Sequence, residues 1–346
     1  MRILITGIAG HLGSSLARWI LQHQPDVEVH GIDDLSCGYP ANIPDGRIQW
    51  ARYSLGHEST FCFERRCEER LCALLAGVDV VFHFAAYAAE GLSPWIRKYD
   101  CRNNLVGTLD LINAAVECGT AKRFVFASSM SVYGRGVPPF DELDPRRPID
   151  PYGISKSACE QHLEAAHAQF GLPYTIIRPH NVYGPGQSCW QRFRNVLAHW
   201  CARAMEGKPL LIYGDGRQER AFSYIDDVVP CLWRAAVEPA AAGQIINLGG
   251  GVPTTIAAAA ELLAEITGAR VSHVSRRHEV KHAWCTTAKS EEILGYRELT
   301  PLNAGLAELW RWCRWAWQAF PERRGTHRVA PLEVERDLYP FWREYV

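Results

Sequence analysis

The sequence has no excess of charge of either sign and no long apolar stretch at its start. Its 37 lysines and arginines are balanced by 38 aspartates and glutamates. A near-neutral chain offers no electrostatic footprint for nucleic acid or for an anionic membrane surface, so neither is expected as a partner. Because no basic leader precedes the first strand-like segment at 2–6, we expect a cytoplasmic protein.

The cysteines form no pattern that is typical of disulfides or of zinc. Twelve of them are scattered along 346 residues, whereas disulfide frameworks belong to small secreted domains. The one local cluster, Cys62, Cys67 and Cys72, has five-residue steps that match no common zinc spacing. We therefore expect free thiols and no metal site.

The pattern along the chain predicts an α/β fold. Strand-like runs at 2–6, 27–32, 78–84, 123–128 and 174–178 alternate with amphipathic segments of helical length. This alternation is typical of βαβ units and of a parallel sheet that is covered on both faces. With 346 residues, of which 47% are hydrophobic, the chain exceeds the usual size of one compact domain, so we expect two lobes.

The boundary between the lobes is expected to be discontinuous. A Gly/Pro-rich turn at 183–186 and a helical stretch at about 193–205 break the rhythm of the first half. The β-branched run at 245–248 then predicts a return to the first sheet. We assign 1–180 plus about 222–248 to the first lobe, and 181–221 plus about 249–346 to the second.

Aromatic residues are concentrated near the end of the chain. Four tryptophans lie within 310–317, and a Tyr-Pro-Phe-Trp sequence occupies 339–342. We interpret them as a packing helix and a tail that packs against the body, rather than as a motif for a partner.

A glycine-rich turn directly after the first strand-like run predicts a dinucleotide site. The glycines of the segment 7–13 permit a tight turn and a close backbone approach to a pyrophosphate, and the following helix offers unpaired N–H groups. Asp33 lies 20 residues past Gly13, where a carboxylate can accept both ribose hydroxyls of an adenosine. This acid would repel the 2′-phosphate of NADP, and no arginine follows at 34–36. We therefore predict a Rossmann-type lobe that binds NAD.

Tyr152 and Lys156 are candidates for the chemistry, because a spacing of four places both on one face of a helix. A phenol with a pKa of about 10 is a poor base at neutral pH, but a neighbouring cation favours the phenolate. Tyr152 could then remove a hydroxyl proton as hydride leaves for NAD⁺. A buried strand-like run ends in Ser128 and Ser129, and one of these serines could bridge the substrate oxygen and the tyrosine.

Together these motifs resemble the extended short-chain dehydrogenase/reductase superfamily, and within it the branch of NAD-dependent nucleotide-sugar epimerases and dehydratases. The likeness covers most of the chain and includes ordered motifs at 83–86, 104–108, 128–134, 178–185 and 220–227. It implies a Rossmann-type doubly wound parallel sheet with a smaller C-terminal substrate-binding lobe. It also implies NAD as the cofactor and a nucleotide sugar as the partner, and we keep a homodimer as one option for the assembly.

The resemblance implies roles for individual residues. The expected catalytic residues are Ser129, which stands three places before Val132, with Tyr152 and Lys156. The expected substrate-binding residues are Ser129, Asn181, Arg220 and Arg276, with Arg277 as an alternative to Arg276. The expected cofactor-binding residues are Gly7, Gly10, His11, Leu12, Gly13, Asp33, Asp34, Ser36, Phe84, Ala85, Ala86, Asn104, Tyr152, Lys156 and His180.

Departures from the family pattern favour epimerisation. The 4,6-dehydratases carry an Asp-Glu pair directly after the catalytic serine or threonine, and the sugar decarboxylases carry Glu at the first of these positions. This chain has Met130 and Ser131 there, so elimination lacks its proton donor and base. Gly186 stands where related uronate epimerases use an arginine after Gly-Pro, which favours a neutral hexose. The loop at 87–91 also replaces the usual sugar-facing sequence, so the identity of the substrate stays open.

We therefore expect an isomerase, an NAD-dependent nucleotide-sugar 4-epimerase with a UDP-hexose as its preferred substrate. In this mechanism C4 of the sugar gives hydride to NAD⁺, the 4-keto sugar turns about its diphosphate, and hydride returns to the other face. The alternatives are a nucleotide-sugar dehydratase or 4-ketoreductase of the same branch and, more remotely, a non-catalytic NAD-binding protein.

Overall fold

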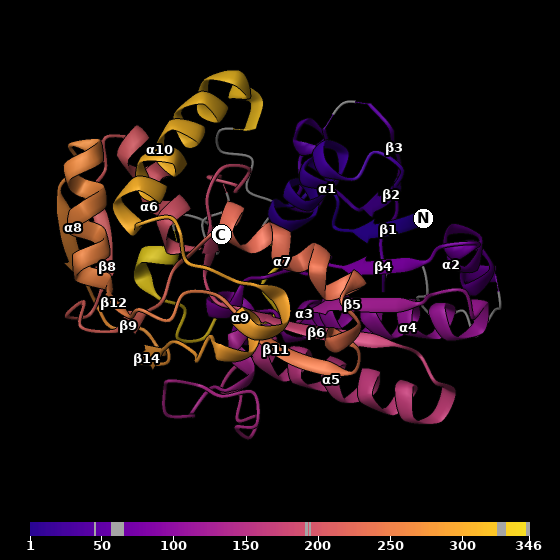
Figure 1. Ribbon diagram of the computed structural model, residues 1–346. Helices are drawn as coiled ribbons and strands as arrows, with labels where there is room; N and C mark the ends of the chain where they lie inside the picture. Colours follow the sequence, from indigo (N-terminus) through magenta and orange to yellow (C-terminus); the bar gives the residue numbers. More distant parts are fainter. Residues whose placement is uncertain (45, 57–65, 191–192, 194, 324–329, 344–346) are drawn as a thin grey trace.

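A computed structural model describes residues 1–44, 46–56, 66–190, 193, 195–323 and 330–343, and its centre is a seven-stranded sheet (Figure 1). The strands follow the order β11-β6-β5-β4-β1-β2-β3, and every adjacent pair is parallel. Their bounds are β1 (Arg2–Thr6), β2 (Glu28–Asp33), β3 (Ile48–Arg52), β4 (Val80–His83), β5 (Arg123–Ala127), β6 (Tyr174–Pro179) and β11 (Gln244–Leu248). The predicted fold class, an α/β doubly wound parallel sheet, is thereby confirmed.

Helices cover both faces of the sheet. Successive side chains of each strand point to opposite faces, so both faces are apolar and each belongs to its own buried cluster. Ile3 and Ile5 of β1 belong to one cluster, whereas Leu4 belongs to the other. Both faces are buried, as expected for a parallel sheet. One face is covered by α1 (His11–His23) and α7 (Ile225–Val237), and the other by α2 (Arg66–Leu75), α4 (Gly107–Cys118) and α5 (Pro151–Phe170).

The sequence pattern predicted every strand of this sheet except β3. That strand lies at an edge, and its residues are exposed or only half-buried, so it carries no apolar signature. The predicted return of the chain at 245–248 corresponds to β11, which pairs with β6 at the opposite edge. The assignment of whole lobes by residue range stays a prediction.

The second half of the chain adds a smaller group of elements beside the sheet. It contains the short helix pair α6 (Val196–Met205) and α8 (Ile256–Thr267) around the parallel strands β8 (Leu210–Tyr213) and β13 (Val271–Val274). The remaining elements of this half are β7 (Val182–Tyr183) with β10 (Ser223–Tyr224), β9 (Glu219–Arg220) with β12 (Thr254–Thr255) and β14 (His282–Ala283), α9 (Ala288–Leu294) and α10 (Leu302–Ala319). The short helix α3 (Arg97–Asp100) belongs to the first half and lies between β4 and α4.

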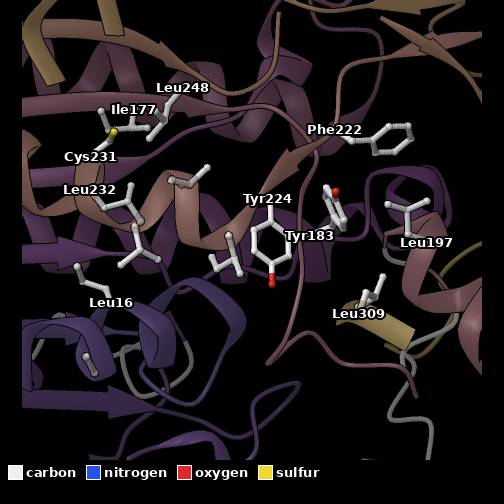
Figure 2. Packing of buried hydrophobic residues seen from close by; sticks show 14 of the residues in the cluster. Leu16, Ile177, Tyr183, Leu197, Phe222, Tyr224, Cys231, Leu232, Leu248 and Leu309 are labelled. Atoms are coloured by element: carbon white, nitrogen blue, oxygen red, sulfur yellow. The ribbon is translucent and has the colours of Figure 1, made fainter. Parts of the chain in front are cut away.

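One apolar core joins this second group to the sheet. Figure 2 shows Tyr183 and Tyr224 between Leu232 of α7 on one side and Leu197 of α6 and Leu309 of α10 on the other. The two tyrosine rings lie 5.7 Å apart, and all five side chains belong to a single buried cluster. The two halves of the molecule therefore share their interior.

The C-terminal tail packs against the body, as predicted from its aromatic residues. Trp342 is buried in a cluster with Leu92 and Ile96, which belong to the segment after β4. The indole N–H of Trp95 donates to the carbonyl of Arg336 at 3.1 Å. In α10, by contrast, Trp315 is half exposed.

The described cysteines form neither a disulfide nor a metal site. Every cysteine side chain that the structure describes is a free thiol. Of the cluster noted in the sequence, Cys72 is half-buried, whereas Cys62 and the side chain of Cys67 lie outside the described residues. Within the described part, no group of three or more His, Cys, Asp and Glu side chains could hold a metal ion. Among the described helices, none has the length and apolar character needed to cross a bilayer.

Candidate active site

A cavity of about 450 Å³ opens above the carboxyl ends of the central strands. The strand order reverses between β1 and β4, and open α/β sheets bind ligands in the crevice that such a reversal creates. The β1–α1 turn and the ends of β2, β4 and β5 form one side of the cavity. The opposite side is formed by α6, β8, β9 and the segment 277–279.

The β1–α1 turn forms a cradle that only glycine permits. Gly7 has a φ of +71°, and a Cβ there would lie 2.9 Å from the amide nitrogen of Ala85. A Cβ on Gly13 would clash with the carbonyl oxygen of Gly7. Gly10 precedes α1 without a side-chain cap, so the first N–H groups of the helix remain available to a ligand. These are the features that a pyrophosphate requires.

Asp33 lies at the carboxyl end of β2, and its carboxylate is fixed by two backbone groups. Oδ2 accepts the N–H of Ala9 at 3.0 Å, and Oδ1 accepts the N–H of Leu35 at 2.8 Å. Leu35 adopts a φ of +60°, which turns the chain back beside the carboxylate. Asp34 in turn accepts the N–H of Ser36 at 2.7 Å. This geometry holds an anionic acceptor at the edge of the cavity.

The first testable prediction concerns Asp33. We expect the wild-type protein to bind NAD much more tightly than NADP, because the carboxylate repels the 2′-phosphate. The Asp33→Asn variant should lose about 1.5–3 kcal/mol of binding free energy for NAD, as is usual for a hydrogen bond to a charged group. Its loss of binding free energy for NADP should be smaller. Fluorescence titration with both dinucleotides measures these affinities. Equal affinities of the wild-type protein for the two would contradict the assignment.

Tyr152 and Lys156 lie in the first two turns of α5. The helix begins at Pro151, and the Asp150 carboxylate caps it by accepting the N–H of Gly153 at 2.9 Å. The Lys156 ammonium lies 5.9 Å from the centre of the Tyr152 ring and donates to the carbonyl of Ala127 at 2.7 Å. The cation that would favour a phenolate is therefore next to the phenol.

The Lys156 ammonium is buried, and this burial lowers its pKa to about 8. Cys159, Asp100 and Glu160 partly oppose the decrease. At neutral pH the side chain is therefore still mainly charged, although the burial makes its proton easier to lose than that of a surface lysine. Burial also raises the pKa of Asp100 to about 6, against hydrogen bonds from Ser155 and Asn104.

The structure separates the two serines at the end of β5. The Ser128 hydroxyl donates to the buried carboxylate of Glu160. The Ser129 oxygen accepts a local N–H bond, from Ser131 at 3.1 Å. Both serines line the cavity, but Ser129 is half-buried, whereas Ser128 is buried. Of the two hydroxyls, that of Ser129 is therefore placed to meet a substrate.

Two arginines lie side by side on the opposite wall. Arg220 of β9 and Arg277 both reach one carboxylate oxygen of Glu279, at 3.4 and 2.9 Å. The Arg277 guanidinium also lies 4.7 Å above the centre of the Tyr213 ring. Such fixed, planar cations suit a diphosphate.

Most of the predicted site residues are brought together around this one cavity. Those that line it are Gly7, Gly10, His11, Leu12, Gly13, Asp33, Asp34, Ser36, Phe84, Ala85, Ala86, Ser129, Tyr152, Lys156, Asn181 and Arg220. Their individual roles in binding or catalysis stay predictions.

Three predicted residues are not among the described residues that line the cavity. The Asn104 amide accepts the N–H of Tyr87 at 2.7 Å and donates to Asp100 at 2.8 Å, so it positions the chain after β4 instead of facing a cofactor. His180 is fully buried. Arg276 packs against Gly214, whereas its neighbour Arg277 is on the cavity wall. The position of Arg277 favours it, the alternative named above, over Arg276, and the role of either arginine at a diphosphate stays a prediction.

The sequence reasoning missed two carboxyl groups on the cavity wall, those of Glu90 and Asp150. Burial and then the charge of Glu90 raise the pKa of Asp150 to about 8, against its bonds to two backbone N–H groups. Asp150 could have been found, because an Asp before Pro is a typical helix start. No local signal places Glu90, which belongs to the short helix η2 (Glu90–Trp95) after β4.

The glycine cradle, Asp33 and the Tyr152/Lys156 pair all lie within one segment that matches a known family. Residues 3–249 match the NAD dependent epimerase/dehydratase family. The chain belongs to this family. Membership confirms the resemblance inferred from the motifs, and it confirms NAD as the cofactor.

Individual members of the NAD dependent epimerase/dehydratase family are similar over nearly their full length. The uncharacterized UDP-glucose epimerase YtcB of Bacillus subtilis is 32% identical over 313 residues, which cover 88% of this chain and 96% of that protein. The structure of UDP-glucose 4-epimerase from Thermotoga maritima with UDP-glucose has a TM-score of 0.82 at 30% identity, covering 91% of this chain and 99% of that one.

A third similar protein acts on a charged sugar. UDP-glucuronic acid 4-epimerase from Bacillus cereus, in complex with UDP-glucuronic acid and NAD, has a TM-score of 0.81 at 29% identity, covering 91% of this chain and 99% of that one. Relatives also include dTDP-glucose 4,6-dehydratases and a nucleotide-sugar decarboxylase. The chain thus belongs to a family of enzymes that act on nucleotide sugars, and the members of this family differ in reaction and substrate.

Proposed function

We propose that this chain is a nucleotide-sugar 4-epimerase. The observation that carries the proposal is the arrangement of one cavity, with Ser129, Tyr152 and Lys156 near the dinucleotide cradle and Arg220 with Arg277 on the opposite wall. A sugar whose diphosphate binds the two arginines lies between them and the tyrosine. The reactive hydroxyl and the nucleotide are thus bound by separate groups.

The residues of the cradle fit NAD, because its glycines leave space for a pyrophosphate and Asp33 holds a fixed acceptor for a ribose. Bound NAD⁺ supplies the acceptor for the hydride of C4. Tyr152 takes the proton of the 4-hydroxyl, and the nearby Lys156 ammonium stabilises the phenolate. Ser129 donates a hydrogen bond to the same substrate oxygen as it becomes a carbonyl.

Epimerisation further requires that the sugar turn while the nucleotide stays bound. Arg220 and Arg277 can hold the diphosphate as a fixed point, since Glu279 anchors both guanidinium groups. The cavity volume of about 450 Å³ is within the range of small-molecule sites. The 4-keto sugar can then present its other face to the hydride, and Tyr152 returns the proton.

A UDP-hexose is the substrate that we favour. The relatives named above include UDP-glucose epimerases. Gly186, which lines the cavity, supplies no cation for the carboxylate of a uronic acid. A homodimer stays a prediction for the assembly.

A dehydratase is the second candidate, and one observation favours it. Met130 and Ser131 supply no carboxyl group after Ser129, but Glu90 and Asp150 place two carboxyl groups on the same cavity wall. The raised pKa of Asp150, about 8, would let it carry a proton at neutral pH. Such an acid could assist the loss of water.

The decisive experiment follows a label in the sugar. The protein is incubated with UDP-, dTDP-, GDP- and CDP-hexoses that carry deuterium at C4, and the products are read by NMR and mass spectrometry. We expect an unchanged mass, deuterium that remains at C4, and the same equilibrium mixture from either C4 epimer. A product that is lighter by one water, or a label that has moved to C6, would instead support the dehydratase.

A further inference from the structure

Glu90 occupies a distinctive place on the cavity wall. It is half-buried, and it begins η2 within the loop at 87–91 that departs from the family pattern. A Cβ on its neighbour Gly91 would lie 3.2 Å from a guanidinium nitrogen of Arg277. The chain at Glu90 therefore runs next to one of the two candidate diphosphate arginines.

The same short helix is connected to Tyr152 by hydrogen bonds. The Ser93 hydroxyl donates to the carbonyl of Glu90 at 2.8 Å and accepts the N–H of Tyr152 at 3.3 Å. Glu90 thus lies between the base at one end of the cavity and the arginines at the other. This is the place where the sugar of a nucleotide sugar must lie if its diphosphate binds Arg277 and its 4-hydroxyl meets Tyr152.

We propose that Glu90 contacts the sugar of the substrate and selects a hexose with an uncharged C6 group over a uronic acid. The inference rests on the proposed function, since that function places the sugar in this part of the cavity. A carboxyl group can accept a hydrogen bond from a sugar hydroxyl, whereas it repels the carboxylate of a uronate.

The charges that face Glu90 support this selection. Arg220, Arg277 and Glu279 act on it from one side, and Asp150 acts from the start of α5. Burial raises the pKa of Glu90, the two arginines oppose this rise, and Glu279 adds to it. Both arginines already share Glu279, and in our proposal they bind the diphosphate. A uronate would therefore place its carboxylate beside Glu90, in a region whose two arginines are already used by Glu279 and by the diphosphate.

The test compares two sugars in the wild-type protein and three variants. UDP-glucose and UDP-glucuronate are titrated calorimetrically into the NAD-loaded wild-type protein and its Glu90→Gln and Glu90→Ala variants, and kcat and KM are measured where turnover occurs. Glu335→Gln is the matched control, because that exposed glutamate lies on the tail and not on the cavity wall. Circular dichroism and NAD affinity report whether each variant is folded.

We expect the wild-type protein to prefer UDP-glucose. Both Glu90 variants should reduce this preference by about tenfold or more, the size expected for a hydrogen bond to a charged group, mainly through KM. The Glu335→Gln control should keep the wild-type ratio. If Glu90→Ala does not fold, the sugar preference of the nearly isosteric Glu90→Gln variant alone tests the proposal.

Two results would overturn the proposal, and they can be told apart. A wild-type protein that binds both sugars equally, or folded variants that keep the wild-type ratio, would exclude Glu90 as the selecting residue while leaving the epimerase in place. A wild-type protein that binds neither of the two sugars would refute this inference, and the labelled panel of UDP-, dTDP-, GDP- and CDP-hexoses then shows whether the proposed function fails as well.

Discussion

Replacing Tyr152 by phenylalanine is expected to lower turnover by a factor of about 10²–10⁴, the usual contribution of general acid–base catalysis. The change removes one oxygen from the cavity and leaves the ring in place. Lys156 keeps its bond to the carbonyl of Ala127, and the helix keeps its cap at Asp150. The fold and the affinity for NAD should therefore be retained. Single-turnover assays with a nucleotide sugar, together with an NAD titration, measure both properties.

Tyr174→Phe is a suitable control for this experiment. Tyr174 lies in β6 with its ring 5.3 Å from that of His167, and it is not among the described residues that line the cavity. We expect its turnover to match that of the wild-type protein. If Tyr152→Phe retained ordinary activity, Tyr152 could not be the base.

The largest loss of stability is expected from Glu160→Ala. Glu160 is fully buried, and its carboxylate accepts bonds from Arg178 at 2.7 and 2.9 Å and from Arg146 at 2.6 Å. Removing it leaves the buried Arg178 guanidinium without its counter-charge, which typically costs about 3–5 kcal/mol. Ser128 also loses its acceptor, so the end of β5 loosens beside Ser129. Urea unfolding measures the free energy of unfolding.

The control is Glu164→Ala, one turn further along α5. Glu164 also pairs with Arg146, but it is partly exposed, so its loss should cost less than about 1 kcal/mol. Similar losses of unfolding free energy in Glu160→Ala and Glu164→Ala would contradict a special role for the buried pair of Glu160 and Arg178.

The cost of Glu160→Ala should also depend on pH. Burial by itself would raise the pKa of Glu160, but the bonds and charge of Arg178 lower it below its ordinary value of 4.5. A carboxylate with a lowered pKa stabilises the fold above that ordinary value and loses this effect as pH falls through the folded-state pKa. The difference in free energy of unfolding between the wild-type protein and Glu160→Ala should therefore become smaller below pH 4.5.

Features that depend on neighbours in the sequence were predictable. The glycines of the cradle and Asp33 belong to a single βαβ unit, and Tyr152 and Lys156 lie on the same face of one helix. Local spacing fixes such geometry, because a strand, a turn and a helix leave few arrangements. That the Ser128 hydroxyl is already bonded, whereas the Ser129 hydroxyl is not bonded to Glu160, depends instead on this distant residue, which lies 32 residues beyond Ser128.

Features that depend on distant contacts were not predictable. Glu90 reaches the wall because η2 packs between α5 and the C-terminal tail, where Trp342 touches the same cluster as Leu92. Asn104 matched a family motif, yet its amide bonds are used by the backbone of Tyr87 and by Asp100. Arg276 and Arg277 are adjacent in an irregular segment, so spacing alone could not tell which one faces the cavity.

The shared core has a consequence for the modularity of this enzyme. Cluster members such as Ile177 of β6 and Leu309 of α10 belong to different predicted lobes, and β11 completes the sheet only after the chain has returned from the second half. A chimaera that joins residues 1–180 to the second half of a relative would remove β11, one of the two neighbours of β6, and cut through the core (Figure 2). Substrate preference in this chain is therefore better exchanged through single residues on the cavity wall than by exchange of whole lobes.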